Sequence, residues 1–357
     1  MVDNLFLCAI LTPVDKKAQK CAHTPWYGSM NTKEKLLGLL ESNTEKYLSG
    51  EDIAEALGIS RTAVWKAVNA LRSDGCAIEA VSNKGYRMVS DADVLSENGI
   101  RKHLGTSIAD IGLSVYPVTD STNIRVREAA LSGAPEGFAA VAGSQTAGRG
   151  RLGRSFYSPA GTGLYLSLLL RPAALPSRQT IKITTLAAVA ACEAIEAVSD
   201  RKAMIKWVND IFIDGKKVSG ILTEASFSLE SDSAEYVILG IGFNILTPEG
   251  GFPDEIKNIA GAIFDRPQKD IRNRLAAEFI SRFMAAYRAP RFGGYEEKYR
   301  ARSLAVGHTV DVLLPAGPKE AYVLDVDDDC RLIVRYPDGT EDSLYSGEVS
   351  IKLSHAR

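Results

Sequence analysis

The sequence predicts an α+β chain of several domains, and three observations lead to that prediction. The chain has 357 residues, enough for two or three domains, and 45% of them are hydrophobic, which is typical of folded proteins. Apolar spacing changes along the chain, from helical, to mixed, to short strands. We expect a helical domain over 30–90, a mixed α/β domain over 91–302 and a β-rich domain over 303–357, preceded by a disordered extension over 1–29.

Charge and cysteine content exclude several classes of protein. Lys plus Arg number 42 and Asp plus Glu 44, so a nucleic acid could be bound only by a local basic patch. The five cysteines have no CxxC spacing, which argues against a disulfide framework or a thiolate metal site and favours a cytoplasmic location. No apolar run approaches the roughly 20 residues that span a bilayer, so we expect no membrane partner.

The first domain has the pattern of a winged helix-turn-helix. A helix is predicted over Thr32–Leu40 with Thr32 as its N-cap, a second after the N-cap Ser49, and a third over 61–72 after the N-cap Ser60. The second and third are joined by a short turn containing glycine, as in helix-turn-helix units. Two short apolar runs within 77–89 flank a turn and predict the hairpin that forms the wing.

Charge within this domain is polarised. Residues 31–60 hold six acids and three bases, whereas residues 61–90 hold five bases and two acids. The third helix and the hairpin are therefore the predicted DNA-binding part, because such motifs contact bases and phosphates near the start of the recognition helix. The candidate DNA-binding residues are Ser60, Arg61, Thr62, Trp65, Lys66, Lys84 and Arg87. A winged helix used only for protein contacts remains the alternative.

The central domain is predicted to contain a mostly antiparallel mixed sheet. Residues 90–100 are polar and indicate a linker into it. Runs of strands separated by tight turns, such as Asp214-Gly215, favour this sheet over a doubly wound one. The predicted strands are 111–118, 138–144, 164–170, 204–206, 211–213, 218–225 and 236–243, and the predicted helices are 123–131, 180–198 and 270–287.

The last 50 or so residues consist of short β-rich runs punctuated by turns. The predicted strands are 308–314, 322–326, 332–336, 342–345 and 349–353. This pattern predicts a small SH3-like β-barrel. The acidic triplet Asp327–Asp329 is expected to be a solvated turn.

The most informative stretch is QTAGRGRLGR, residues 145–154, in which arginines alternate with glycines. Glycines let backbone amides approach an anion, and arginines donate paired hydrogen bonds to phosphate or carboxylate. No Asp or Glu occurs between Gly137 and Cys192, although six bases do, so we expect an anionic ligand. A flexible RGG-like linker is the alternative, but the segment lies between two predicted strands. Neither a Walker A motif nor a dinucleotide fingerprint fits it.

A second polar cluster follows at KWVND, residues 206–210. It lies between two predicted strands and brings an amine, an amide and a carboxylate together, a set suited to nucleotide phosphates and Mg²⁺. Lys217 follows the next hairpin turn. An isolated lysine or aspartate is usually an ordinary solvated surface residue. The combination of these residues with the arginine-rich stretch favours a binding site instead.

Taken together, these motifs resemble those of the bifunctional biotin-protein ligase and biotin-operon repressor family. The resemblance covers residues 31–353, and its motifs are TDSTN (119–123), QTAGRGRLGR (145–154), KWVND (206–210), KVSGIL (217–222), GIGFN (240–244) and GEVS (347–350). Two positions depart from the family pattern: Val208 replaces the usual proline, and Phe156 stands where tryptophan is common. The resemblance implies a class II synthetase-like central domain.

The resemblance also implies a two-step reaction with ATP and Mg²⁺ as cofactors. Biotin and ATP form biotinyl-5′-adenylate, and a lysine of the biotin carboxyl carrier protein of acetyl-CoA carboxylase then attacks it. The implied catalytic residues are Lys217, Arg151, Arg149 and Asp210. The implied biotin-binding residues are Ser121, Thr122, Asn123, Gln145, Gly148, Arg149, Arg151, Lys217, Gly220 and Leu222. The implied ATP or adenylate residues are Arg151, Arg154, Phe156, Lys206, Asn209, Asp210 and Asn244, with Asp210 also the Mg²⁺ candidate.

Regulation is implied in the same way. The family relationship predicts binding to biotin-operon operator DNA and a ligand-dependent homodimer. Ordering of the arginine-rich stretch by an anion would trap the adenylate and complete the dimer surface. Two other functions stay open: a lipoate-type protein ligase, and a biotin-sensing repressor without ligase activity.

Overall fold

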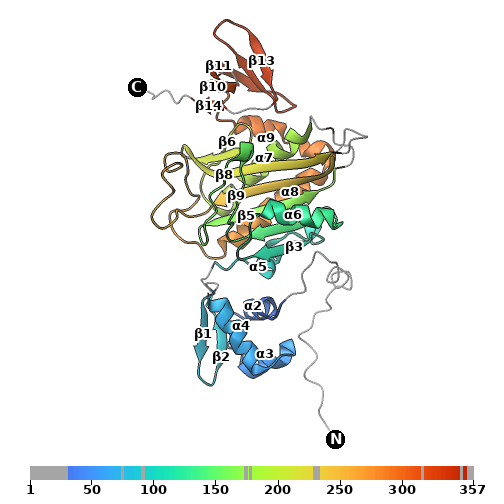
Figure 1. The fold of residues 1–357 in the computed structure, drawn as a ribbon, viewed down its shortest axis with the longest axis vertical. Helices are drawn as coiled ribbons and strands as arrows, with labels where there is room; N and C mark the ends of the chain where they lie inside the picture. Colours follow the sequence, from blue (N-terminus) through green and yellow to red (C-terminus); the bar gives the residue numbers. More distant parts are fainter. Residues whose placement is uncertain are drawn as a thin grey trace.

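The computed structural model describes residues 31–73, 76–89, 93–172, 176, 179–227, 234–314, 317–345 and 349–351. The predicted extension over 1–29 and the first two residues of GEVS lie outside these ranges. The three predicted domains follow one another along the long axis of the molecule, with the central domain between the other two (Figure 1). Within the described part, no helix is both long and apolar enough to cross a membrane.

The N-terminal domain is a winged helix-turn-helix, as predicted. Its elements are α2 (Thr32–Glu41), α3 (Gly50–Leu57), α4 (Arg61–Ser73), β1 (Ile78–Val81) and β2 (Gly85–Met88). The two strands pair antiparallel as the wing. Apolar faces of the three helices enclose a core of Leu36, Leu40, Ile53, Val64, Val68 and Leu71, which is separate from the core of the central domain.

The helix ends follow the predicted caps with one exception. Ser49 caps α3 through a bond from the amide of Asp52, and Ser60 accepts the amide of Ala63 at the start of α4. The prediction of Thr32 as the first N-cap is wrong. Asn31 caps α2 instead, because its side chain accepts the Glu34 amide while the Glu34 carboxylate accepts the Asn31 amide.

The central domain is built on one seven-stranded sheet with the order β3-β4-β5-β9-β8-β7-β6. Only β3 and β4 pair in parallel and every other neighbouring pair is antiparallel, which confirms the predicted mixed sheet. The strands are β3 (Leu113–Tyr116), β4 (Ala139–Ala142), β5 (Gly163–Leu170), β6 (Met204–Lys206), β7 (Asp210–Ile213), β8 (Lys216–Phe227) and β9 (Ala234–Asn244).

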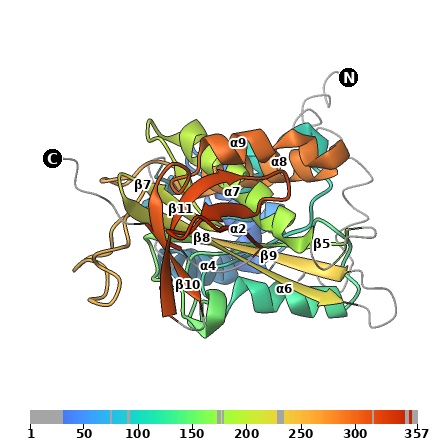
Figure 2. The ribbon, with the colours of Figure 1, turned by 90° about the horizontal axis from the view of Figure 1, so that it is seen from above.

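Helices cover both faces of this sheet. Figure 2 shows α7 (Thr180–Val198) and α8 (Ile271–Arg288) on one face and α6 (Thr122–Leu131) on the other. Alternate residues of β5 point to opposite faces. Leu164, Leu166, Leu168 and Leu170 therefore join the large core with α7 and α8, while Leu169 packs with the smaller cluster under α6. The face under α6 carries the site described below.

The predicted linker over 90–100 is wrong in its second half, because Glu97–His103 forms helix α5. Ser96 caps this helix, and Ile100 is completely buried. Asn273 of α8 accepts the Ser96 amide and is itself buried. The polar groups at the start of α5 are therefore held by a contact with α8, which the local sequence pattern does not reveal.

The C-terminal domain is a five-stranded antiparallel sheet of the order β13-β12-β11-β10-β14, in agreement with the predicted SH3-like class. The strands are β10 (Thr309–Leu314), β11 (Gly317–Val326), β12 (Leu332–Arg335), β13 (Glu341–Leu344) and β14 (Val349–Ile351). Helix α9 (Glu296–Ala301) leads into it. Short 3₁₀ turns among the described residues are η1 (Thr106–Ile108), η2 (Arg151–Gly153) and η4 (Pro290–Gly294).

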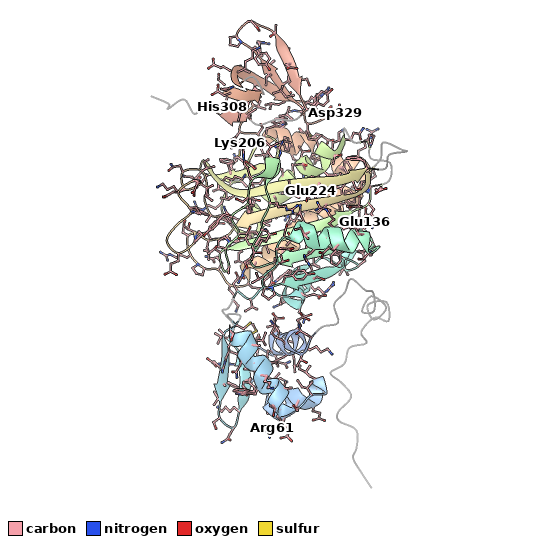
Figure 3. The ribbon with its side chains drawn as sticks, in the orientation of Figure 1. Arg61, Glu136, Lys206, Glu224, His308 and Asp329 are labelled. Carbon is pink, nitrogen blue, oxygen red and sulfur yellow. The ribbon has the colours of Figure 1, made fainter. Side chains whose placement is uncertain are left out.

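In the acidic triplet, Asp328 and Asp329 are exposed, as predicted, whereas Asp327 is partly buried, and the turn also docks the C-terminal domain. Asp328 pairs with Arg300 at 2.9 Å and Asp329 with Lys182 at 3.0 Å. The turn lies at the junction of the two domains (Figure 3). The indole Nε1–H of Trp207 donates to the carbonyl of Cys330, the next residue of this turn, at 3.0 Å. The KWVND segment therefore helps to hold the C-terminal domain in place.

Candidate functional site

Two adjoining clefts lie over the sheet face that carries α6. Arg149 and Phe156 line both. The other predicted residues that line the first cleft are Ser121, Thr122, Asn123, Gln145, Gly220 and Leu222. The second cleft, of ≈ 260 Å³, is lined by the predicted residues Arg151, Arg154, Lys206, Asn209, Asp210 and Lys217, and shares Gly220 and Leu222 with the first. The structure thus brings together motifs that lie up to about a hundred residues apart in sequence.

The floor of the first cleft is made of glycine backbone. Gly240 and Gly242 of β9 face α6, as Gly220 of β8 does. A Cβ atom on Gly242 would overlap the ring of Phe156, and one on Gly240 would overlap the side chain of Asn123. Glycine at these positions therefore lets an aromatic ring and a polar side chain lie directly on the sheet.

Neutral hydrogen-bonding groups surround the inner end of this cleft. The Thr122 amide donates to Gln145 Oε1 at 2.8 Å, and Gln145 Nε2 donates to Ser158 Oγ at 3.1 Å. Ser158 Oγ in turn donates to the carbonyl of Phe156 at 2.9 Å. Such a buried, uncharged set suits a neutral polar ring. Sequence analysis missed Ser158, although its position just after the arginine-rich stretch was a signal.

The arginine-rich stretch is a loop between β4 and β5, as predicted, and it folds back on itself. The Gly150 amide donates to the Arg154 carbonyl at 2.7 Å, and the Phe156 amide donates to the Gly148 carbonyl at 2.9 Å. Gly148 lies behind the cleft wall, where a Cβ would meet the Phe156 carbonyl. Leu152 at the loop tip is 77% exposed and has a positive φ of 55°.

The outer cleft is charged. Lys217 Nζ lies 2.7 Å from Asp210, and both side chains are about three-quarters buried. Arg151 donates to Asn209 Oδ1 at 2.9 Å, which joins the loop to the KWVND segment. Lys206 lies at the sheet end nearest the C-terminal domain (Figure 3). The Trp207–Val208 peptide bond, at the position of the family proline, is cis.

The charged cleft contains one carboxylate that fits a magnesium role. Across the described residues, no three His, Cys, Asp or Glu side chains gather closely enough to hold a metal by themselves. Mg²⁺ commonly binds one or two carboxylates and completes its coordination with substrate phosphates and water. Asp210, next to Lys217 and within reach of an anion in the cleft, fits that mode only when phosphate supplies further ligands.

Two features of the clefts differ from the sequence analysis. Asn244 does not line either cleft, and its side chain donates to the Gly261 carbonyl at 3.1 Å. Leu313 and Val349 of the C-terminal domain line the second cleft, although no local pattern singled them out. They reach it because the Trp207 contact docks that domain beside the KWVND segment.

Arg61, at the start of α4, lies at the end of the molecule away from the central domain (Figure 3). Arg61, Thr62, Trp65, Lys66 and Lys84 are exposed, Trp65 by 57%. Ser60 caps α4. Arg87 pairs with Glu79 at 2.8 Å and lies over the ring of Tyr47. An exposed indole beside basic side chains on a recognition helix is the arrangement expected of a nucleic-acid contact surface.

Family models match all three domains. The biotin/lipoate A/B protein ligase family matches residues 115–244, an HTH domain matches 32–87, and the biotin protein ligase C-terminal domain matches 306–352. The last match, together with the relatives below, favours the biotin branch over the lipoate alternative.

Relatives and solved structures agree with these matches. The bifunctional ligase/repressor BirA of Bacillus spizizenii is 37% identical over 320 residues, which covers 88% of this chain and 97% of that protein. The biotin–(acetyl-CoA-carboxylase) ligase of Mycobacterium tuberculosis is 32% identical, covering 67% of this chain and 89% of that one. The biotin protein ligase from Aquifex aeolicus, solved with biotin and ATP, has a TM-score of 0.54 at 27% identity and covers 68% of this chain and 98% of that chain. The chain therefore belongs to the biotin protein ligase family, in its bifunctional ligase/repressor form.

Proposed function

We propose that the chain activates biotin with ATP as biotinyl-5′-adenylate, transfers it to a lysine of a biotin carboxyl carrier protein, and represses transcription at a biotin operon. The observation that carries the proposal is the pair of clefts, one neutral and one cationic, that meet at Arg149 and Phe156. The neutral cleft suits a ureido ring and an apolar chain beside Leu222. The cationic cleft suits the phosphates of ATP.

The first step joins two anions: the biotin carboxylate attacks the α-phosphate of ATP, and pyrophosphate leaves as the bond between the α- and β-phosphates breaks. Arg149, Arg151 and Lys217 offset their repulsion and stabilise the charge that builds up in the transition state, so catalysis is mainly positioning and electrostatics. Mg²⁺ at Asp210 would neutralise phosphate charge. Lys217 pairs with Asp210 at 2.7 Å, so with Asp210 engaged by a metal ion the Lys217 amine would be available to the reacting groups.

The second step needs a protected adenylate and an incoming amine. The arginine-rich loop orders over the adenylate because its arginines then meet an anion, which keeps water from the mixed anhydride. The lysine amine of the carrier domain attacks the acyl carbon, biotinyl-lysine forms and AMP leaves. Arg154 and Lys206 hold the nucleotide from the outer side of the cleft.

One assay tests the ligase. The purified chain is incubated with biotin, MgATP and an apo carrier domain, and biotin on the carrier is detected by avidin blot. Transfer that requires ATP supports the proposal. Transfer of lipoate but not of biotin, when lipoate is supplied in a parallel reaction and followed by the mass of the carrier, supports the lipoate alternative, and adenylate binding without any transfer supports the repressor without ligase activity.

Repression is proposed to depend on a ligand-induced homodimer. A single winged helix presents few bases and binds weakly, so specificity requires two modules on a palindromic site. Loop ordering by the adenylate would complete the interface between central domains, and operator DNA would in turn favour the dimer by linkage. Sedimentation and a mobility-shift titration with a biotin-operon promoter test this. Equal operator affinity with and without adenylate would refute the ligand-dependent repression and mean that the N-terminal domain of the ligase does not respond to the adenylate.

A further inference from the structure

A buried chain of hydrogen bonds lies beneath the neutral cleft and reaches the sheet face under α6. It consists of Glu224, Asn123, Ser167 and Thr122, and we call it the polarity chain. Ser167 of β5 has no exposed surface, and Thr122 and Asn123 at the start of α6 are 3% and 5% exposed. Of the four, Ser167 and Glu224 do not line the cleft. Figure 3 shows Glu224 on the sheet beside α6.

The direction of each hydrogen bond in the polarity chain follows from counting donors and acceptors. Arg127 pairs with Glu224 at 2.7 Å, and Asn123 Nδ2 donates to the other Glu224 oxygen at 2.7 Å. A carboxylate only accepts, so the Asn123 amide must turn its NH₂ toward Glu224. Asn123 Oδ1 then faces Ser167 Oγ at 2.6 Å and takes the single hydroxyl proton of Ser167.

The same count of donors and acceptors gives the direction of the hydrogen bonds nearer the cleft. Ser167 Oγ lies 2.7 Å from Thr122 Oγ1, and since its proton is already given to Asn123, it must accept the proton of Thr122. The other acceptor within reach of that proton, Gln145 Oε1, is more distant at 3.2 Å and already takes the Thr122 amide. Thr122 therefore presents lone pairs rather than a proton to the cleft that it lines.

The orientation of the Gln145 side-chain amide is fixed by its neighbours in the same way. Ser158 Oγ gives its proton to the Phe156 carbonyl, so it accepts from Gln145 Nε2, which turns Oε1 toward the Thr122 amide. One N–H of Gln145 has no partner among the described residues. The cleft thus offers an acceptor at Thr122 and a donor at Gln145, which matches the N–H and C=O groups of a cyclic urea.

We propose that Ser167, Asn123 and Glu224 are positioning residues that determine specificity by fixing Thr122 as a hydrogen-bond acceptor. The proposal rests on the proposed biotin site and assigns Asn123 a supporting role, because both ends of its amide are held by protein groups. Ligands with an N–H at this position are accepted. Ligands with a ring oxygen there are rejected, because two acceptors then face each other in a buried site.

Glu224→Gln is the sharpest perturbation, because it keeps the shape but loses the acceptor-only character. A glutamine can donate to Asn123 Oδ1, which lets the Asn123 amide flip and donate to Ser167. Ser167 then donates to Thr122, and the Thr122 proton is released toward the cleft. Ser167→Ala is the second variant and removes the link outright. Glu235→Gln is the matched control, since Glu235 lies on the neighbouring strand β9, accepts a hydrogen bond from Ser226 at 3.2 Å and lines neither cleft.

The test compares dissociation constants by calorimetry for biotin and for the two cyclic carbamates in which one ureido N–H is replaced by a ring oxygen. The wild-type chain and Glu235→Gln should prefer biotin over at least one carbamate by tenfold or more. Glu224→Gln and Ser167→Ala should narrow that ratio by about tenfold, with thermal unfolding confirming that each variant folds. If the ratio of the carbamate and biotin dissociation constants is unchanged in both variants, with or without weaker binding overall, the proposed role of the polarity chain is wrong. A wild-type chain that does not bind biotin overturns the proposed site itself.

Discussion

Replacement of Lys217 by alanine should slow adenylate formation severely while leaving the fold intact. The Lys217 amine lies 2.7 Å from Asp210 and lines the cationic cleft beside Arg149 and Arg151. Without it, the Asp210 carboxylate faces the incoming phosphates with one compensating charge fewer. Both side chains are about three-quarters buried, but they line an open cleft where water can solvate Asp210, so the chain should still fold, which thermal unfolding checks.

The size of the effect follows from charge and distance. A lysine about 4 Å from a phosphate oxygen interacts by ~4 kcal/mol at an effective dielectric constant of about 20. Removal of one preorganised electrostatic contact typically raises a barrier by about 3 kcal/mol. The rate of adenylate formation should therefore fall by roughly a hundredfold or more.

Single-turnover pyrophosphate release measures this step directly. Lys216→Ala is the matched control, because Lys216 precedes Lys217 in the same strand but donates to the Asn258 carbonyl and lines neither cleft. Lys217→Arg should recover part of the rate, since it restores the charge. Pyrophosphate release at the wild-type rate from Lys217→Ala would refute the electrostatic role.

Three further outcomes are expected. Arg151→Gly loses the bond to Asn209 that ties the loop to the cleft, so adenylate should escape and biotinylate bystander proteins; an avidin blot with an unchanged bystander-to-carrier ratio would contradict loop closure. Deletion of residues 1–90 should abolish operator binding in a mobility-shift assay while adenylate synthesis continues. Retained DNA binding would show that the DNA-binding site lies outside these residues. Glu41 accepts a hydrogen bond from Ser96 across the domain junction, and burial raises the pKa of its carboxyl group. The folded chain therefore binds more protons than the unfolded chain, and its free energy of unfolding should fall as the pH rises from the ordinary carboxyl range through the raised pKa. Glu41→Gln should flatten this dependence in thermal unfolding between about pH 4 and 8, and identical slopes would show that Glu41 does not carry it.

Much of the architecture was predictable because it is encoded locally. Helix α7 begins and ends at the predicted residues, since a long apolar segment without Gly or Pro permits little else. Ser49 and Ser60 were identifiable as caps because a cap acts on an amide only a few residues away. The errors at Thr32 and over 90–100 arose where a neighbouring cap or a distant helix decided the outcome.

By itself, the sequence determined the chemistry of the site: which arginines, lysines, amides and glycines are present and in which loops they stand. It did so because anion-binding glycines and charges are recognisable within ten residues. Only the tertiary structure decided how they meet. Ser167 was an ordinary strand residue until the sheet placed it under α6, and Glu224 acquired its role through Asn123, 101 residues earlier in the chain. Hydrogen-bond direction depends on the whole connected set of donors and acceptors, and that set exists only after strands and helices from distant parts of the chain have packed together.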